Sequence, residues 1–368
     1  MSQDRRFEEF NFTGQQDTAE FGLRGAPFPL ALKPADDWKP TLAETIDGIK
    51  RLIQSEDLLG RVREHGGAVL FRGLPIRTPQ DYSEVAHVFG FEAHEEVGRP
   101  PLRTVLAKNV KTANEGPPEM PIWPHNEYGW STINPAWLTF SCLRVPEEGG
   151  ETPIISSLGL AAALKKQAPD FIEKLLLKGV KYVYRYDVKE VKSNTGTSVF
   201  DAYGQHIRPG DDRDTVRRKI EEEVKRHSNR FEWHEDAMVA GEHVVLTVEQ
   251  VIRRHEETGL TTWFGNLTSA WGRTRHHGAT EPPYLGDDGS YHPPPEYGDG
   301  SPIEKEYLDL ALSIAEESQV LVSWQNGDMV LLDNYAVMHS RSPWKGERIV
   351  LAALWDNNNE SRIGDYLN

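Results

Sequence analysis

The chain has 368 residues and a formal net charge of −16, with 38% hydrophobic and 10% aromatic residues. This apolar content supports a sizeable core and excludes disorder as the main state. The acidic balance argues against nucleic acid and anionic membrane surfaces as partners, because both require clustered Lys and Arg. The lone cysteine, Cys142, excludes intrachain disulfides, and we interpret it as a small core residue. Without a signal-peptide or membrane-spanning pattern, we expect a cytoplasmic protein.

The predicted elements alternate between short strands and amphipathic helices. Residues 1–40 are polar and interrupted by prolines, which indicates a leading arm or an edge strand. Apolar residues at helical spacing predict a helix over 41–63, before a Gly-Gly turn. Further helices are predicted over 81–90, 157–167, 214–225 and 303–317. Strands are predicted over 68–71, 137–143, 319–324, 329–333 and 349–354, and this pattern favours an antiparallel sandwich or jelly roll.

One long stretch interrupts this pattern. Residues 279–302 hold many of the prolines and glycines of the chain. A segment this irregular inside a compact domain indicates either a mobile lid or a packed functional loop. We interpret it as a candidate lid that closes over the site and protects the reaction from water.

Two His-x-acid tripeptides are candidates for metal binding, His125-Asn126-Glu127 and His234-Glu235-Asp236. In a strand, positions i and i+2 share a face, so an imidazole and a carboxylate can reach one metal ion. A distant histidine would complete a two-histidine, one-carboxylate set with open positions for a co-substrate and oxygen. Surface hydrogen bonding is the alternative for either tripeptide. The context favours the first, since the second follows a basic helix and has no strand-bounded frame.

The neighbouring pair His276-His277 resembles a metal-binding pair. It lacks a nearby acid at a useful spacing, so we interpret it as loop surface.

Six segments stand in a fixed order along the chain. They are HGGAVLFRG (65–73), HNE (125–127), GGETP (149–153), YGDGSPI (297–303), WQNGD (324–328) and LDNYAVMHSRSPWKGER (332–348). In this order they resemble the taurine dioxygenase family of Fe(II)/2-oxoglutarate-dependent oxygenases, most closely its clavaminate synthase-like members. The resemblance covers about residues 60 to 356, and several motifs in order are far more specific than any one of them.

The resemblance implies a mainly β fold with surrounding helices, namely a double-stranded β-helix (a cupin-like jelly roll). It implies a single oxygenase domain over residues 61–368, with a long insertion between the metal motifs over about 160–318. Residues 1–60 are then an arm and a helix that pack on this core.

The implied activity needs Fe(II), 2-oxoglutarate and O2. Such an enzyme hydroxylates, desaturates or cyclises at an unactivated C–H of a small organic molecule, and releases succinate and CO2. Matched residue by residue, the family's iron ligands correspond to His125, Glu127 and His339. Its 2-oxoglutarate contacts correspond to Arg348 and Thr152, and a guanidinium suits a carboxylate because it donates two parallel hydrogen bonds.

Two departures from the family pattern matter. The carboxylate is Asp in many relatives, whereas here it is Glu127, a longer side chain that clavaminate synthase-like proteins also have. Halogenating relatives replace the acid by a small residue, so Glu127 argues against halogenation. The stretch Trp263-Phe264-Gly265-Asn266 carries an inserted glycine relative to the family, which leaves the role of Asn266 open.

Substrate contacts are less well defined. Tyr128 and Trp130 follow the iron motif and are candidates for lining the pocket, with core packing as the alternative. Arg341 lies two positions after His339 and is a further candidate, with a structural salt bridge as its alternative. The acidic net charge favours a neutral or amine-bearing small molecule. The oligomeric state is left open, with a homo-oligomer as one option.

Two other classes of protein compete with this interpretation. A zinc metallohydrolase with the same ligands would work without O2 or 2-oxoglutarate, and it would leave Arg348 without a task. A non-catalytic jelly-roll binding protein would tolerate the loss of a metal ligand, whereas all three are present here. Both alternatives are therefore disfavoured.

Overall fold

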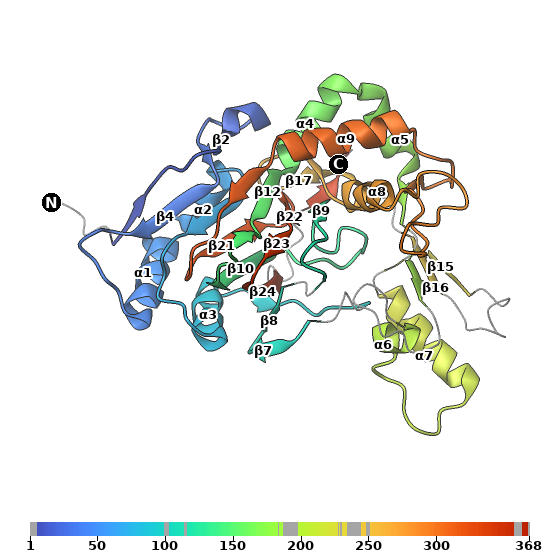
Figure 1. Cartoon of the computed structure of the whole chain (residues 1–368), viewed down its shortest axis with the longest axis horizontal. Helices are drawn as coiled ribbons and strands as arrows, with labels where there is room; N and C mark the ends of the chain where they lie inside the picture. The colour runs from blue at the N-terminus through green and yellow to red at the C-terminus, as the bar shows by residue number, and fades with distance from the viewer. Residues whose placement is uncertain are drawn as a thin grey trace.

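Two β-sheets form the centre of the molecule, with helices around them (Figure 1). The structure is a computed structural model that describes residues 6–98, 103–113, 116–182, 184–186, 198–226, 228, 230–233, 244–247, 251–356 and 363–366. In sheet order, the main sheet consists of β1 (Phe7–Glu9), β4 (Leu30–Pro34), β5 (Ala68–Phe71), β21 (Met329–Asp333), β10 (Trp137–Arg144), β24 (Ile349–Asp356), β8 (Val110–Thr112) and β7 (Val105–Ala107). A short strand, β6 (Glu92–Ala93), also pairs with β24.

The second sheet carries the candidate site. Its order is β20 (Val320–Val322), β12 (Thr152–Ser156), β22 (Val337–Arg341) and β9 (Ile122–His125). The chain passes from the main sheet to this one between β21 and β22, within four residues. Two such sheets, largely antiparallel and joined by crossing connections, confirm the predicted jelly roll.

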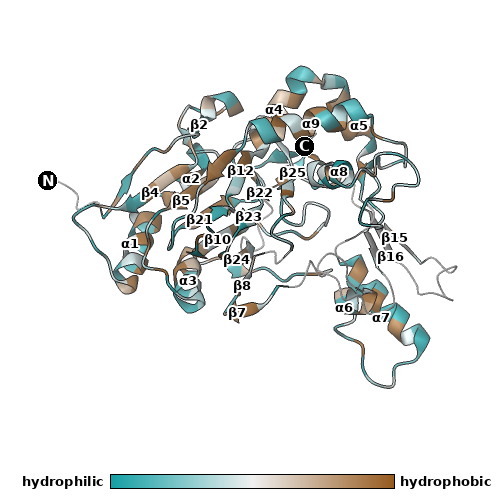
Figure 2. Cartoon of the chain, viewed as in Figure 1, coloured by the Kyte–Doolittle hydropathy of each residue, from teal (hydrophilic) through white to brown (hydrophobic). Residues whose placement is uncertain are grey.

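The main sheet is buried on both faces. Along β24, Val350, Ala352 and Leu354 belong to the core cluster shared with the second sheet, while Leu351 and Ala353 belong to a second cluster under the N-terminal helices. Successive strand residues point to opposite faces, so apolar residues are favoured at successive positions of the central strands. The central strands are accordingly hydrophobic along much of their length (Figure 2).

The predicted helix over 41–63 is wrong as a single element. The chain forms α1 (Leu42–Ser55) and α2 (Leu58–Glu64). Asp57 between them has a left-handed backbone (φ 47°), and its carboxylate accepts a hydrogen bond from Gly60 N–H over 3.2 Å. Such a side chain caps a new helix rather than extending the old one, which is why the helix breaks there.

Most other predicted elements are confirmed to within a few residues. The helices concerned are α3 (Pro79–Ala86), α4 (Ser157–Gln167), α7 (Arg213–Lys225) and α9 (Lys305–Glu317). Three further helices were not predicted: α5 (Pro169–Lys178), α6 (Val199–Tyr203) and α8 (Leu267–His276). Of these, α8 lies against β9 and therefore behind the candidate site.

The N-terminal arm supplies edge strands. β1 pairs with β4, and β4 runs parallel to β5, so the arm extends the main sheet. A separate three-stranded sheet, β14 (Tyr184–Tyr186), β16 (Val244–Thr247) and β15 (Arg230–Trp233), lies with α6 and α7 to one side of the two main sheets (Figure 1). Among the described residues, no helix combines the length and apolar character that a membrane crossing requires.

Candidate active site

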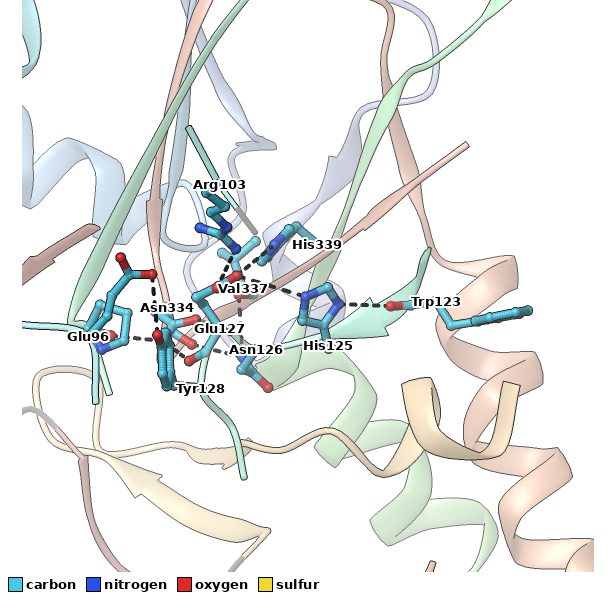
Figure 3. Close-up of polar contacts among 11 residues, drawn as sticks. Glu96, Arg103, Trp123, His125, Asn126, Glu127, Tyr128, Asn334, Val337 and His339 are labelled. Carbon is cyan, nitrogen blue, oxygen red and sulfur yellow. Dashed lines mark hydrogen bonds and ion pairs between the residues drawn. The ribbon is translucent and has the colours of Figure 1, made fainter. Parts of the chain in front are cut away.

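Strand pairing brings two distant histidines together. β9 and β22 are neighbours in the second sheet, and His125 and His339 are register partners. Their ring centroids lie 4.4 Å apart (Figure 3). The fold therefore joins the two histidines of the sequence prediction at one point of the sheet.

Glu127 completes this cluster from outside the strand. Its Oε2 lies 3.4 Å from Nε2 of His339 and 3.9 Å from Nε2 of His125. The three ligand atoms all lie within 4.8 Å of one another. The prediction that both residues of the tripeptide share a strand face is wrong, because β9 ends at His125 and Glu127 lies in the turn that follows.

Two buried asparagines shape that turn, and sequence reasoning missed both. The side chain of Asn334 accepts from Glu127 N–H (2.8 Å) and donates to Glu127 C=O (2.9 Å). Asn126 donates to the Asn334 carbonyl (2.8 Å) and accepts from Gly265 N–H (3.0 Å). A buried amide with its donors and acceptors satisfied fixes its surroundings, so these contacts hold Glu127 towards the histidines.

Arg103 contacts the other oxygen of Glu127, and it too was not predicted. Its Nη2 donates to Oε1 over 2.8 Å (Figure 3), and both side chains are largely buried. Burial by itself would raise the pKa of the Glu127 carboxyl, but the Arg103 guanidinium and His339 hold this pKa well below its usual range. Glu127 is therefore a carboxylate at neutral pH.

The imidazole of His125 is suited to act as a neutral ligand. The Nδ1 of His125 lies 2.8 Å from the carbonyl of Trp123, which can only accept, so Nδ1 carries the proton and Nε2 keeps its lone pair for a metal ion. Burial, with His339 nearby, lowers the pKa of His125 to about 4. The buried Nδ1 of His339 has no hydrogen-bond partner in the described part of the chain. Two imidazoles and a carboxylate fit a divalent transition metal such as Fe(II).

A second His–acid contact is structural. His255 Nε2 lies 3.1 Å from Asp333 Oδ2, and its Nδ1 lies 2.9 Å from Thr258 Oγ1. Both ring nitrogens are thus engaged, and the pair is buried. The tripeptide at 234–236 lies outside the described residues.

The interpretation of His276-His277 as loop surface is only partly right, because His276 is the last residue of α8 and not a loop residue. His276 is exposed, whereas His277 is buried. The Nδ1 of His277 lies 2.8 Å from Oδ1 of Asp287. The acid was missed because it stands ten residues away and is brought back by a turn.

Arg348 and Thr152 lie together at the end of the second sheet. Arg348 Nη2 is 3.5 Å from Thr152 Oγ1, and its Nε donates to the Gly150 carbonyl over 2.9 Å. Trp324 Nε1 donates to the same threonine oxygen over 3.1 Å. Burial lowers the pKa of Arg348 to about 10, which leaves it charged at neutral pH. No ion pair joins Arg348 to a carboxylate within the described ranges, so this guanidinium fits an incoming carboxylate.

Tyr128 and Trp130 are both buried beside the cluster. Tyr128 has a positive φ of 54°, and its hydroxyl donates to Glu96 Oε1 over 3.2 Å. The two rings stack with centroids 5.6 Å apart. Their packing is extensive, and contact with a substrate stays a prediction.

Arg341 anchors a loop. Its Nη2 donates to the carbonyls of Pro117 (3.1 Å) and Met120 (2.8 Å), just before β9. Its guanidinium lies 4.6 Å from the Trp344 ring centre. These carbonyl contacts give Arg341 a structural task different from the predicted salt bridge, and its contact with a substrate stays a prediction.

Asn266 lies directly before the first residue of α8. Its backbone N–H donates to Tyr182 Oη over 3.0 Å, while its side-chain Oδ1 is buried without a partner among the described residues. Its functional role stays open.

Comparison with known protein families matches residues 39–355 to the family described as taurine catabolism dioxygenase TauD, TfdA. The chain belongs to this family. It is therefore a 2-oxoglutarate-dependent dioxygenase that uses Fe(II), as its motifs predicted. This also removes the two competing classes, the metallohydrolase and the non-catalytic binding protein.

Individual relatives agree. A clavaminate synthase-like protein of Arabidopsis thaliana is 30% identical over 332 residues, which cover 89% of this chain and 93% of that protein. The dapdiamide synthesis protein DdaC of Enterobacter agglomerans is 25% identical over 292 residues, which cover 79% and 82%. The crystal structure of PvcB from Pseudomonas aeruginosa aligns with a TM-score of 0.50 at 15% identity, covering 97% of this chain and 93% of that one, which shows a shared fold.

Proposed function

We propose that His125, Glu127 and His339 hold the Fe(II) of this oxygenase. The observation that carries the proposal is the convergence of their three ligand atoms within 4.8 Å. When bound, the iron supplies O2 activation for oxidation of a C–H bond. The carbonyl of Trp123 keeps the proton of His125 on Nδ1, and Arg103 keeps Glu127 ionised.

We further propose that Arg348 and Thr152 bind the distal carboxylate of 2-oxoglutarate. Support comes from the charge of Arg348 and from the threonine hydroxyl 3.5 Å away. The Nε of Arg348 is held by the Gly150 carbonyl, so the guanidinium is pre-oriented and loses little entropy on binding.

For the substrate, we propose a neutral or amine-bearing small molecule that is hydroxylated, desaturated or cyclised. The acidic net charge of −16 supports this. We also propose that residues 61–368 act as one oxygenase domain, with 160–318 as its insertion and 1–60 packed on it.

The test is turnover of 2-oxoglutarate by metal-free protein reloaded with Fe(II) or with Zn(II). Candidate amines and neutral metabolites are supplied with O2, and succinate is quantified. We expect succinate only with Fe(II) and O2 together, and at least about 100-fold less from His125→Ala or His339→Ala. Equal succinate from wild type and both variants would refute the ligand assignment. Matched controls are variants of the exposed His276, which should turn over normally.

A further inference from the structure

A second group of metal-ligating side chains lies at the C-terminal end of α8. His277 directly follows this helix. The chain then returns in a hairpin over 284–292, closed by the bridge between Leu285 and Tyr291 and by a 2.9 Å hydrogen bond from His292 N–H to the Tyr284 carbonyl. The hairpin brings Asp287, Asp288 and His292 back to His277.

The geometry of this group is that of a converging donor set. His277 Nδ1 lies 2.8 Å from Asp287 Oδ1 and 3.9 Å from Asp288 Oδ2. His292 Nε2 lies 3.0 Å from both oxygens of Asp288. Ligand atoms of His277, Asp288 and His292 all lie within 4.8 Å of one another. None of these residues belongs to the iron cluster.

The carboxylates of this group favour a bound cation. The two imidazole rings stack nearly parallel, with centroids 4.2 Å apart and planes at 8°. Asp287 and Asp288 bring two carboxylates to the stacked rings, and a divalent cation bound there would offset their charge.

The surrounding backbone is built to hold these side chains. Ser290 N–H donates to Asp288 Oδ1 over 2.9 Å, which orients the carboxylate. A Cβ at Gly286 would lie 2.8 Å from each of Asp288 Oδ1, His277 Cβ and His292 Cδ2, so a glycine is needed for this close approach. His277 is 6% exposed, whereas Asp288 is 39% exposed, so solvent reaches the group from the carboxylate side.

We propose that His277, Asp288 and His292 bind one divalent transition-metal ion, of the class of Zn2+, that fastens the 284–292 hairpin to the end of α8, with Asp287 orienting the ring of His277. Imidazole and carboxylate are the donors that such ions take, and ligands from one short segment make a local structural site. This site is independent of the oxygenase function and shares no residue with it.

The position of the site gives it a consequence for the iron cluster. Along α8, Thr268 Oγ1 donates to the Pro124 carbonyl over 2.6 Å, and Gly272 lies against the ring of Trp123. Both contacted residues belong to β9, the strand that ends at His125. Metal at the hairpin therefore stabilises the helix that supports this strand.

The test uses the full chain carrying His125→Ala and His339→Ala, so that the iron cluster is disabled. Metal-free protein is titrated with Zn2+ against a chelator of known affinity. We expect one equivalent of Zn2+ to bind. Adding His292→Gln or Asp288→Asn should weaken this binding by at least about 100-fold, since loss of an outer-shell partner alone costs 10- to 100-fold. Adding His276→Gln, at the exposed neighbour, should change nothing.

Thermal unfolding of the same proteins separates binding from folding. Zn2+ should raise the melting temperature of the double variant and of its His276→Gln form, and should not raise it in the His292→Gln or Asp288→Asn forms. The proposal is overturned if the folded double variant binds no Zn2+. It is equally overturned if both the His292→Gln and Asp288→Asn forms keep full affinity.

Discussion

Arg103 donates a hydrogen bond to Oε1 of Glu127 over 2.8 Å, and this contact leaves Oε2 of the same carboxylate turned towards both histidines. One carboxylate oxygen is thus held by Arg103, and the other is available to the metal that we propose at this cluster. It also supplies the positive charge that offsets the burial of the carboxylate.

Replacing Arg103 with Met should make iron binding more sensitive to acid. Without the guanidinium, burial raises the pKa of Glu127, and protons compete with Fe(II) at higher pH. We expect the midpoint of anaerobic iron binding against pH to move up by about one unit or more, because a neighbouring opposite charge typically shifts a carboxyl pKa by 1–3 units. Arg103→Lys, which keeps the charge, should move it less. An unchanged profile in Arg103→Met would contradict this role.

Replacing Arg348 with Met should weaken the binding of 2-oxoglutarate without abolishing the binding of iron. Charge-assisted hydrogen bonds to a carboxylate contribute about 1.5–3 kcal/mol each, so the affinity should fall by about 100-fold. Thr152→Val removes one hydroxyl and should lower the affinity for 2-oxoglutarate by about 10-fold or less. Both affinities come from anaerobic 2-oxoglutarate titrations of the iron-loaded protein. If Arg348→Met bound 2-oxoglutarate as tightly as wild type, the carboxylate would have to bind elsewhere.

Asp328 should be among the most destabilising positions to substitute. It is fully buried, its Oδ2 accepts from Arg72 Nη2 (3.1 Å) and Gln325 N–H (2.9 Å), and its Oδ1 accepts from Gly73 N–H (3.0 Å). Asp328→Ala leaves these donors unpaired and should lower the free energy of unfolding by about 3–5 kcal/mol in a urea titration.

The matched control for Asp328→Ala is Glu148→Ala. Glu148 pairs with Lys345 over 2.7 Å, but both side chains are mostly exposed. Removing such an exposed pair should change the free energy of unfolding by no more than about 0.5 kcal/mol. Similar losses in the two variants would contradict the structural role given to Asp328.

The metal-free protein should lose stability in mild acid because of His125. Burial lowers its pKa from 6.5 in a free chain to about 4 in the fold. Between these values the unfolded chain takes up a proton that the folded chain does not, so stability present above pH 6.5 is lost as the pH falls towards 4. The slope should be of the order of 1 kcal/mol per pH unit. His125→Gln should flatten that slope in urea titrations across this range, and an unchanged slope would contradict it.

Sequence patterns predicted the repetitive parts of the fold. Strands such as β10 and β21, and helices such as α4, could be predicted from the spacing of apolar residues and from turn residues. Both signals lie within a single short segment of the sequence. The two halves of α1–α2 were merged because the apolar spacing continues across Asp57, while the break depends on a left-handed backbone that spacing does not reveal.

The candidate site also has one part that sequence patterns predicted and one part that they did not. His125, Glu127 and His339 stand in motifs that can be matched in order. Arg103 and Asn334 act on Glu127 through contacts formed only when distant segments meet, over 24 and 207 positions, so even the motif that contains Asn334 does not reveal this contact. The acid beside His277 was missed for a related reason, because a hairpin folds it back.

We propose that His125, Glu127 and His339 form the iron site and that Arg348 binds 2-oxoglutarate there. The most direct measurement is an anaerobic titration of metal-free protein with Fe(II) and then 2-oxoglutarate, followed by visible absorption. We predict a weak charge-transfer band that needs both additions in wild type, is absent in His125→Ala and His339→Ala, and persists in His234→Ala. Absence of the band in wild type, with wild type and His125→Ala binding iron equally, would contradict the account.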